Sequence, residues 1–403
     1  MNTSFQETLA QRIQVNPAFQ RDYSDILNYS FTNSMEKSGV VDTKKIQRLA
    51  ESAIILASSP NDAHNKTAFE IASTLYEQFQ VEYPGIGGVT KLICSRLGNI
   101  PAIDLLDTDA IELPVSLEVE SEAAIDNHTV IVGNKALKFT EFQHDSYELL
   151  SKGYSLSLSA PTSAGKSFLI THFVANQLAS RKKYHAVVIV PTRALIRQLV
   201  ADFSKVFFEY KQNQLLAEDV TLCTASFEPS ELVPPKALFI LTQERFQAIL
   251  YNWKNRPKFD LLVVDESQKI GDKKRGIILE DSINELIVNQ PDIQAVFLSP
   301  LASNPDFLLE LTNSQSNTQP LHTVVSPVAQ HVYSVKTSGG KKGKISISRI
   351  RVTTETLVTD LEINRAIPSR RADRLAFIAK LLSRGKSSII YSTGPSDAER
   401  NAL

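Results

Sequence analysis

Cysteine, tryptophan and methionine are scarce in this chain of 403 residues, which has two cysteines, one tryptophan and two methionines. Cys94 and Cys223 are far apart in apolar surroundings, which excludes a disulfide scaffold and a zinc ribbon and fits a reducing compartment. No apolar run of about 18 residues occurs, and the N-terminus lacks the basic and apolar regions of a signal peptide. These absences predict a cytoplasmic protein with no membrane partner.

An excess of one charge sign is also lacking, because 43 basic side chains nearly balance 44 acidic ones. This balance excludes a wholly basic nucleic-acid coat but permits a local basic groove. Residues 1–120 hold 16 acidic and 9 basic side chains, so the rest of the chain holds 28 and 34. The basic excess after residue 120 is a first indication of a polyanionic partner for that part.

Apolar residues recur at helical spacing through residues 1–110, most clearly over residues 43–58 and 62–79. Asp62 is placed to cap the second of these helices, and the glycines of residues 85–88 are expected to break the chain before a third helix. No catalytic constellation is found in this part of the sequence. We therefore predict a helical accessory or docking domain over residues 1–110.

Residues 111–138 change to short alternating stretches, at 115–119 and 129–132, which predict strands that lead into the next domain. From residue 139 to 315, continuous apolar strands alternate with helices, which predicts an α/β domain with a parallel sheet covered on both faces. The strand candidates span residues 154–158, 186–190, 237–241, 261–264 and 295–298.

Residues 316–368 are polar and contain a basic stretch, 336–351, with six lysine or arginine residues and no acid. Two interpretations of this stretch remain open, a patch that follows phosphates and a solvated loop. Residues 369–403 are expected to open a second α/β domain, with a helix over 371–382 and a strand over 387–392. Since these pieces cannot bury a core alone, we expect the chain to be cut short within that domain.

The strongest chemical signal is a Gly-Lys-Ser loop between a strand and an apolar helix, which is the context of a phosphate-binding loop. Backbone amides at the helix N-terminus face the phosphates, and Gly165 lets the backbone approach them closely. Lys166 is expected to reach the β- and γ-phosphates of ATP, and the Ser167 hydroxyl is expected to bind Mg²⁺. The expected ATP-binding loop consists of Pro161, Thr162, Ser163, Ala164, Gly165, Lys166 and Ser167.

A second signal is an apolar strand that ends in two acids, Asp265 and Glu266, about 100 residues after the loop. Asp265, at the carboxyl end of the strand, can hold Mg²⁺ through water, and Glu266 can polarise the attacking water. Together with Lys166, this pair predicts catalysis of ATP hydrolysis.

With both signals in place, the chain resembles a superfamily 2 helicase of the DExH branch, of the superkiller type. The loop from Pro161 to Lys166, Pro-Thr-Ser-Ala-Gly-Lys, is typical of that branch. Gln143 stands about 20 residues before the loop, where the family uses a glutamine to contact adenine. The resemblance covers residues 139–403 and implies that residues 139–315 form a RecA-like domain.

Further motifs follow in the order of the family. Thr192 and Arg193, and later Gln243 and Arg245, resemble residues that contact the nucleic-acid backbone. An Arg-Gly pair at residues 275–276 also follows the superkiller pattern. The resemblance therefore implies a nucleic-acid strand held by these four side chains.

Two motifs depart from the family pattern. Gln268 ends the acidic box where the family has histidine or aspartate, and Pro300 and Leu301 follow Ser299 where the family has Ser-Ala-Thr. In the family these motifs link ATP hydrolysis to strand movement. Gln268 and Ser299 are therefore the expected coupling residues of this chain.

The resemblance implies an ATP-dependent helicase or translocase that uses ATP and Mg²⁺ and moves along or unwinds nucleic acid. The variant boxes and the unfamiliar N-terminal domain favour a divergent prokaryotic enzyme, and with it DNA over RNA. Some anti-phage systems, the Hachiman type among them, pair such a helicase with a nuclease. By that analogy, the expected protein partner is a nuclease that binds residues 1–110.

Alternatives remain open. In the family, an arginine finger lies further into the second domain, so this stretch alone is expected to bind ATP but hydrolyse it slowly. A nucleic-acid sensor or docking subunit without unwinding activity therefore remains possible, as does an RNA helicase of the same branch. A P-loop enzyme that acts on small molecules, such as a kinase, is disfavoured by the backbone-contacting motifs.

Overall fold

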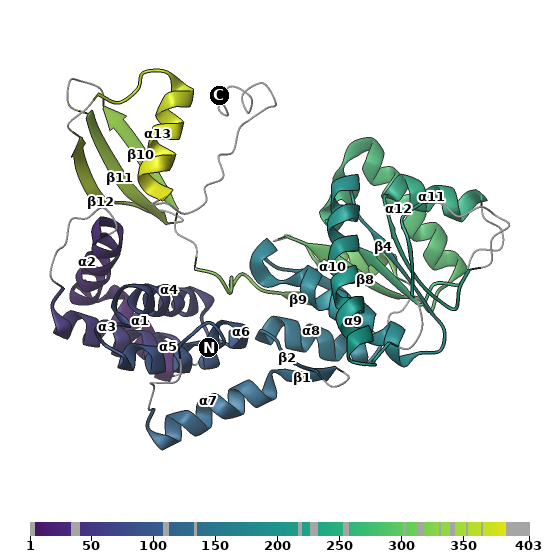
Figure 1. The fold of residues 1–403 in the computed structure, drawn as a ribbon, viewed down its shortest axis with the longest axis horizontal. Coiled ribbons are helices and arrows are strands. Elements are labelled where there is room, and N and C mark those ends of the chain that lie inside the picture. The colour runs from purple at the N-terminus through teal and green to yellow at the C-terminus, as the bar shows by residue number, and fades with distance from the viewer. Residues whose placement is uncertain are drawn as a thin grey trace. The chain divides into compact units, whose positions relative to one another are not determined.

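The computed structural model of the chain describes residues 5–33, 41–107, 113–132, 135–216, 220–225, 233–252, 258–300, 304–312, 317–329, 332–338, 343–351, 354–363 and 366–383. The chain divides into two compact units (Figure 1). The α/β unit comprises residues 94–107 and 113–328, and the second unit comprises residues 1–93, 108–112 and 329–403. The five-part division expected from the sequence stays a prediction.

The α/β unit is built on a seven-stranded sheet in the order β5-β6-β4-β7-β8-β3-β9, and every pairing in it is parallel. Its strands are β3 (Ser155–Ser159), β4 (Tyr184–Ile189), β5 (Thr221–Cys223), β6 (Lys236–Leu241), β7 (Leu261–Val264), β8 (Gln294–Ser299) and β9 (Thr318–His322). The predicted parallel α/β fold is confirmed.

Helices cover both faces of this sheet, as predicted. The helices are α8 (Glu141–Ser151), α9 (Lys166–Ser180), α10 (Arg193–Gln212), α11 (Gln243–Asn252) and α12 (Lys273–Asn289). Alternate strand residues point to opposite faces. Val188 therefore packs in a core with α8, α9 and α10, while Val187 and Ile189 pack in a core with α11 and α12. This double coverage explains why the central strands are apolar throughout.

The five predicted strands are confirmed to within two residues at each end, but the two edge strands were not predicted. β5 has only three residues, too few to show a pattern. β9 has the sequence Thr-Gln-Pro-Leu-His, which is polar and contains Pro320. Proline is tolerated there because an edge strand has one side without a ladder partner. The sheet consequently extends past residue 315.

One of the two strands predicted between residues 111 and 138 is wrong. Residues 115–119 begin helix α7 (Val115–Asn127), and only Thr129–Val132 is a strand, β1, which pairs with β2 (Lys135–Lys138). The five-residue alternation was too short to distinguish a strand from a helix. The glutamates, alanines and leucine that fill α7 favour a helix.

The second unit begins with helices, as predicted. They are α1 (Phe5–Val15), α2 (Pro17–Asn33), α3 (Thr43–Leu56), α4 (Asp62–Phe79) and the start of α5 (Gly85–Arg96), while α6 (Ile100–Ile103) belongs to the α/β unit. Two details differ from expectation. Asn61, not Asp62, caps α4, because its side chain accepts from the Ala63 amide at 2.9 Å. The glycines of residues 85–88 start α5 instead of preceding it.

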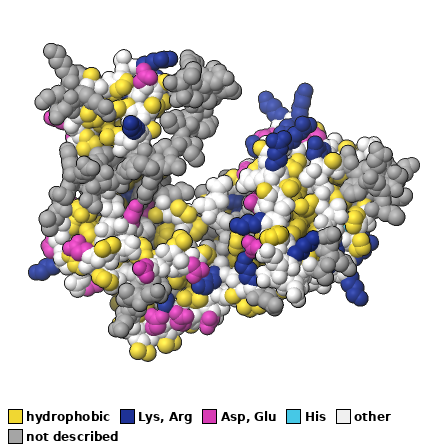
Figure 2. Space-filling view, in the orientation of Figure 1, with side chains coloured by type: hydrophobic (Ala, Val, Ile, Leu, Met, Phe, Trp, Pro, Cys, Tyr) yellow, Lys and Arg dark blue, Asp and Glu magenta, His cyan; other side chains and the backbone are white. Residues whose placement is uncertain are grey.

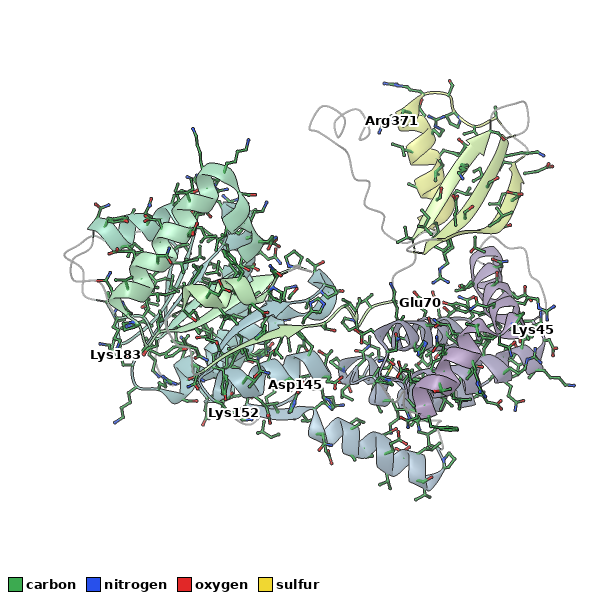
Figure 3. All side chains as sticks on the ribbon, turned by 180° about the vertical axis from the view of Figure 1, so that it is seen from behind. Lys45, Glu70, Asp145, Lys152, Lys183 and Arg371 are labelled. Carbon is green, nitrogen blue, oxygen red and sulfur yellow. The ribbon has the colours of Figure 1, made fainter. Side chains whose placement is uncertain are left out.

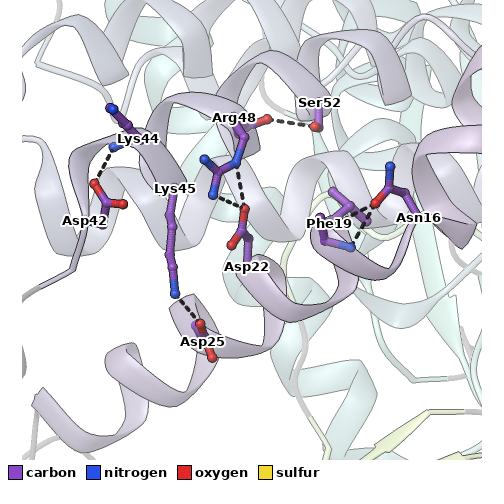
Figure 4. A network of polar contacts seen from close by, with 10 residues as sticks. Asn16, Phe19, Asp22, Asp25, Asp42, Lys44, Lys45, Arg48 and Ser52 are labelled. Carbon is purple, nitrogen blue, oxygen red and sulfur yellow. Dashed lines mark hydrogen bonds and ion pairs between the residues drawn. The ribbon is translucent and has the colours of Figure 1, made fainter.

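Polar contacts join α2 to α3 around an apolar core (Figure 4). Arg48 pairs with Asp22 at 2.7 Å and Lys45 with Asp25 at 2.5 Å. Such partly exposed pairs contribute up to about 1 kcal/mol each. The buried face of α3 consists of Ile46, Leu49, Ala53 and Leu56, which are the apolar residues whose spacing predicted this helix.

The later part of this unit is a three-stranded antiparallel sheet in the order β10-β11-β12 with a helix packed on it. Its elements are β10 (Tyr333–Ser338), β11 (Gly343–Arg351), β12 (Thr354–Ile363) and α13 (Arg371–Ser383). The helix expected over residues 371–382 is confirmed, whereas the strand expected over residues 387–392 lies outside the described residues.

This sheet bears on the basic stretch of residues 336–351. Lys336 pairs with Glu355 at 2.9 Å and Lys344 with Glu362 at 3.0 Å, both from the neighbouring strand. Lys341 and Lys342 lie outside the described residues. Two of the six basic side chains thus have acid partners on β12, and the choice between a phosphate-following patch and a solvated loop stays open.

Candidate active site

Three predicted chemical segments meet at one edge of the α/β unit. The loop before Lys166 follows β3, Asp265 follows β7, and Ser299 ends β8. β7 pairs with β8, and β8 pairs with β3, in parallel register. Their carboxyl ends therefore lie side by side, which is where parallel α/β sheets bind ligands.

The loop after β3 needs glycine at position 165. Gly165 has φ of 73°, and it links a short 3₁₀ turn, η1 (Thr162–Ala164), to α9. A Cβ atom at this position would lie 2.3 Å from the Nε2 atom of Gln143. Backbone conformation and close packing thus both exclude a side chain.

The Lys166 ammonium lies inside this loop. It is buried and donates to the carbonyl oxygens of Ala160 at 2.5 Å and Pro161 at 3.0 Å. Burial lowers the pKa of Lys166, and the charges of Asp265 and Glu266 oppose that effect. The acids after β7 therefore help to keep the lysine charged, as phosphate binding requires.

The other loop residues differ in accessibility. Thr162 and Ser167 are exposed, and Ala164 is buried. Ser163 shares a 2.8 Å hydrogen bond with Ser326, which follows β9. The unpredicted edge strand thus brings a chain segment against the phosphate-binding loop.

Asp265 and Glu266 hold the turn after β7. The Asp265 amide donates to the Ile189 carbonyl at 2.9 Å, and its carboxylate accepts from the Glu266 amide at 2.9 Å. Burial raises the pKa of Asp265, although the hydrogen bond from Glu266 opposes the rise. A half-buried carboxylate of this kind gains from a nearby cation.

Glu266 adopts a left-handed backbone with φ of 52°, unusual for a residue other than glycine. Its carboxylate accepts from Gln268 Nε2 at 2.5 Å. Such backbone strain is typical of functional sites. Gln268, expected to couple hydrolysis to movement, is thus placed to orient Glu266.

The donor set fits a Mg²⁺ ion. The exposed Ser167 hydroxyl and the Asp265 carboxylate both belong to this edge, and Mg²⁺ prefers such oxygen ligands. These two residues would hold the ion, which would supply positive charge to the phosphates of ATP.

The Gln143 side chain forms hydrogen bonds with the phosphate-binding loop. Its Nε2 donates to the carbonyls of Ala164 at 3.1 Å and Gly165 at 3.4 Å, and its Oε1 accepts from the Thr140 amide at 2.9 Å. It also forms a reciprocal cap with Thr140 at the start of α8. The buried amide therefore supports the phosphate-binding loop, and its contact with adenine stays a prediction.

A cavity of about 370 Å³ lies beside the start of α9. Ser167, Phe168 and His172 line it from α9, and Lys135 and Glu209 line it from β2 and α10. The buried Nδ1 atom of His172 has no hydrogen-bond partner among the described residues. Burial lowers the pKa of His172 to about 4, so the ring is neutral at pH 7.

The four predicted strand-contacting residues fall into two groups. Thr192 and Arg193 are exposed at the start of α10, where Thr192 caps the helix through the Leu195 amide at 3.3 Å. Gln243 is buried, and Arg245 donates to the Thr224 carbonyl. In this conformation the first pair is accessible to a strand, while the second pair holds internal contacts.

Arg275 has a role that sequence reasoning missed. Its Nη2 donates to the Pro191 carbonyl at 2.7 Å and its Nε to Glu244 Oε1 at 2.7 Å. With its amide oxygen toward Arg275, Gln243 accepts from Nε at 3.0 Å and Nη2 at 3.2 Å. One guanidinium thus joins the starts of α10, α11 and α12, and the only sequence signal was the Arg-Gly pair.

Ser299, the second expected coupling residue, is buried at the carboxyl end of β8. Its hydroxyl and that of Ser267 have no hydrogen-bond partner among the described residues, while Leu301 lies outside them. These two buried hydroxyls lie at the carboxyl edge of the sheet, where they are free to form hydrogen bonds in another conformation of the domain.

Part of this chain is similar to known helicases. Residues 140–305 match the DEAD/DEAH box helicase family. The DExH-box ATP-dependent RNA helicase DExH10 of Arabidopsis thaliana is 30% identical over 207 residues, which cover 50% of this chain and 19% of the relative. The ATP-dependent DNA helicase Hel308 of Pyrococcus abyssi is 29% identical over 168 residues, which cover 41% and 22%.

Among solved structures, the crystal structure of the DUF1998 helicase MrfA is similar with a TM-score of 0.36 and 19% identity, over 47% of this chain and 30% of that one. The matched part of this chain spans about a fifth of the length of the two curated relatives. Residues 140–305 are therefore a DEAD/DEAH box helicase domain of superfamily 2, in its DExH branch.

Proposed function

We propose that this chain supplies the ATP-binding half of a helicase or translocase that couples ATP hydrolysis to movement along nucleic acid. One observation carries the proposal. Lys166, Asp265 and Glu266 share the carboxyl edge of a single sheet, and Arg275 fastens the loop of Thr192 and Arg193 to the same part of the α/β unit.

The positions of these residues support the following roles. Lys166 and the loop amides would bind the ATP phosphates, and Ser167 and Asp265 would hold Mg²⁺. Glu266, oriented by Gln268, accepts a proton from the attacking water. The exposed Thr192 and Arg193 contact phosphates of the strand, which gives little base specificity.

DNA is the substrate that we favour, and RNA is the alternative. One relative is named as an RNA helicase and another as a DNA helicase, so their names support both polymers. The preference for DNA rests on the departures at Gln268, Pro300 and Leu301 from the superkiller pattern and on the unfamiliar N-terminal domain.

The test is ATP turnover by the whole chain with no nucleic acid, single-stranded DNA, duplex DNA or RNA. Lys166→Ala serves as the blank because it removes the phosphate-binding ammonium. We expect one polymer to raise turnover in the wild type and not in the blank. If every polymer leaves both turnover and ATP affinity unchanged, and none binds, the proposal is wrong.

A sensor or docking subunit is the second candidate. The internal contacts of Gln243 and Arg245 favour it, because both side chains are engaged within the domain in this conformation. Such a subunit would bind ATP and polymer without polymer-stimulated turnover in the same assay.

A protein partner belongs to this proposal as well. The helices of residues 5–96 hold no catalytic group that we identify among the described residues, which suits a docking role for a partner such as a nuclease. No described helix has both the length and the apolar character needed to span a membrane.

A further inference from the structure

A basic surface lies at the end of the α/β unit where α10 and α12 begin. Figure 2 shows lysine and arginine side chains gathered at that end. The exposed basic residues at the two helix starts are Arg193, Arg197, Lys273 and Lys274, which we term the α12 basic surface. The two lysines immediately precede the Arg-Gly pair of residues 275–276 that follows the family pattern.

Arg275 fixes where this surface lies. Its hydrogen bond to the Pro191 carbonyl at 2.7 Å ties the first turn of α12 to the loop that carries Thr192. Lys273 and Lys274 immediately precede Arg275 in that turn. They are therefore held beside the residues that we propose to contact the strand, on the same unit.

The nearby acids are already engaged. Asp272 lies 3.4 Å from the Lys269 ammonium, and Glu244 pairs with Arg275 at 2.7 Å. Lys273 and Lys274 form no ion pair with another residue in the described part of the chain. Their positive charge is thus exposed to solvent without a local counter-charge.

The lysines do not serve the helix itself. The first turn of α12 contains no acid, and a cation there opposes the helix dipole by about 0.3–1 kcal/mol. A cation at an unfavourable helix position that gains no ion pair there suggests a role in binding a ligand.

We propose that Lys273 and Lys274 extend the nucleic-acid interface of this domain by contacting phosphates of the strand held at Thr192 and Arg193. The inference rests on the proposed function. The ligand is the phosphodiester backbone of a polynucleotide, because exposed lysine side chains bind phosphates without reading sequence.

The experiment measures binding of a labelled single-stranded oligonucleotide to the whole chain between about 0.05 and 0.3 M salt. The test variant is Lys273→Gln/Lys274→Gln. The matched control is Lys182→Gln/Lys183→Gln, which removes the same charge from two exposed residues just before β4, at the amino edge of the sheet. Figure 3 labels Lys183 at that end.

We expect the slope of log affinity against log salt to fall by about 0.7 per lysine in the test variant and to stay unchanged in the control. If both proteins bind alike near 1 M salt, the test variant binds roughly 25-fold more weakly at 0.1 M. Affinity for an ATP analogue stays at the wild-type value in both, which shows that the domain is folded.

The outcomes are separable. An unchanged slope in the test variant, or an equal loss in the control, overturns the proposed surface while leaving the proposed function intact. A wild-type chain that binds no polynucleotide at any salt overturns the proposed function and this inference with it.

Discussion

Arg349 on β11 donates from Nη2 to Glu70 Oε2 on α4 at 2.7 Å, across 279 residues of sequence. Both side chains are buried, and Tyr23 joins them by donating to Glu70 at 2.5 Å and accepting from Arg349 at 3.2 Å. The helices of the second unit are therefore fastened to its sheet by a buried ion pair.

Removing one partner of this pair is expected to destabilise the second unit strongly. Arg349→Met leaves the Glu70 carboxylate buried without a counter-charge, which costs about 3–5 kcal/mol. Hydrogen exchange of the α4 and β11 amides measures the change.

The double variant Arg349→Met/Glu70→Leu is the control, since two apolar side chains remove the buried charge altogether. It should recover much of the lost protection. Equal loss in the single and double variants would show that the ion pair does not hold α4 to the sheet.

Gly165→Ala is expected to disable the phosphate-binding loop. The new Cβ would meet Gln143 Nε2 at 2.3 Å, and the positive φ adds about 1–2 kcal/mol of strain. Gly153→Ala is a matched control, because φ there is 86° but no atom lies within 4 Å. Binding of an ATP analogue should fall in Gly165→Ala and stay at the wild-type value in Gly153→Ala.

The sequence predicted the central sheet well because each central strand is an uninterrupted apolar run. Residues 261–264 were predicted as a strand, and β7 has those bounds. β9 was not predicted because its residues are mostly polar and include Pro320. Its parallel pairing with β3 is what identifies it as a strand. The strand predicted at residues 115–119 was wrong because the alternation of apolar and polar residues there favoured a strand, whereas the helix propensity of the whole segment 115–127 favoured a helix.

The candidate site was predicted where chemistry depends on residues next to a strand end, as at Lys166 and Asp265. Contacts between distant segments could not be predicted. Nothing near Arg275 in the sequence indicates that it bonds to Pro191, 84 residues earlier. The same applies to Arg349. The sequence placed it in the basic stretch of residues 336–351, but its side chain is buried beside Glu70.

Gly276→Ala is expected to destabilise the α/β unit, against the usual trend. In a helix, alanine is ordinarily about 1 kcal/mol better than glycine. Here a Cβ would lie 2.1 Å from the Ile270 carbonyl oxygen, so the backbone would have to shift, at about 1–3 kcal/mol. Gly271→Ala, with no atom within 4 Å, should change the unfolding temperature little. Equal unfolding temperatures for the two variants would contradict the close packing.

His172 should make the stability of the α/β unit depend on pH. Burial, aided by the Lys135 charge, lowers its pKa from 6.5 to about 4. Between these values the unfolded chain binds a proton that the folded chain does not, so stability falls as pH drops from about 6.5 to about 4. The upper limit is about 3 kcal/mol, which water in the adjoining cavity reduces.

Urea unfolding at several pH values in this range tests the effect. His172→Asn should flatten the dependence, whereas His322→Asn, which changes an exposed histidine, should leave it as in the wild type. A dependence that persists in His172→Asn assigns it to other groups.

Glu266→Gln is expected to separate ATP binding from hydrolysis. The amide keeps the size of the side chain but cannot accept a proton from water, so polymer-stimulated turnover should fall by about 10²–10⁴-fold. Affinity for ATP should be kept, because Lys166 and the loop carry the phosphate contacts. Gln268→Leu removes only the hydrogen bond at 2.5 Å that orients Glu266, so turnover should fall less while ATP affinity again stays constant. A turnover in Glu266→Gln equal to that of the wild type would mean that another group at this edge activates the water.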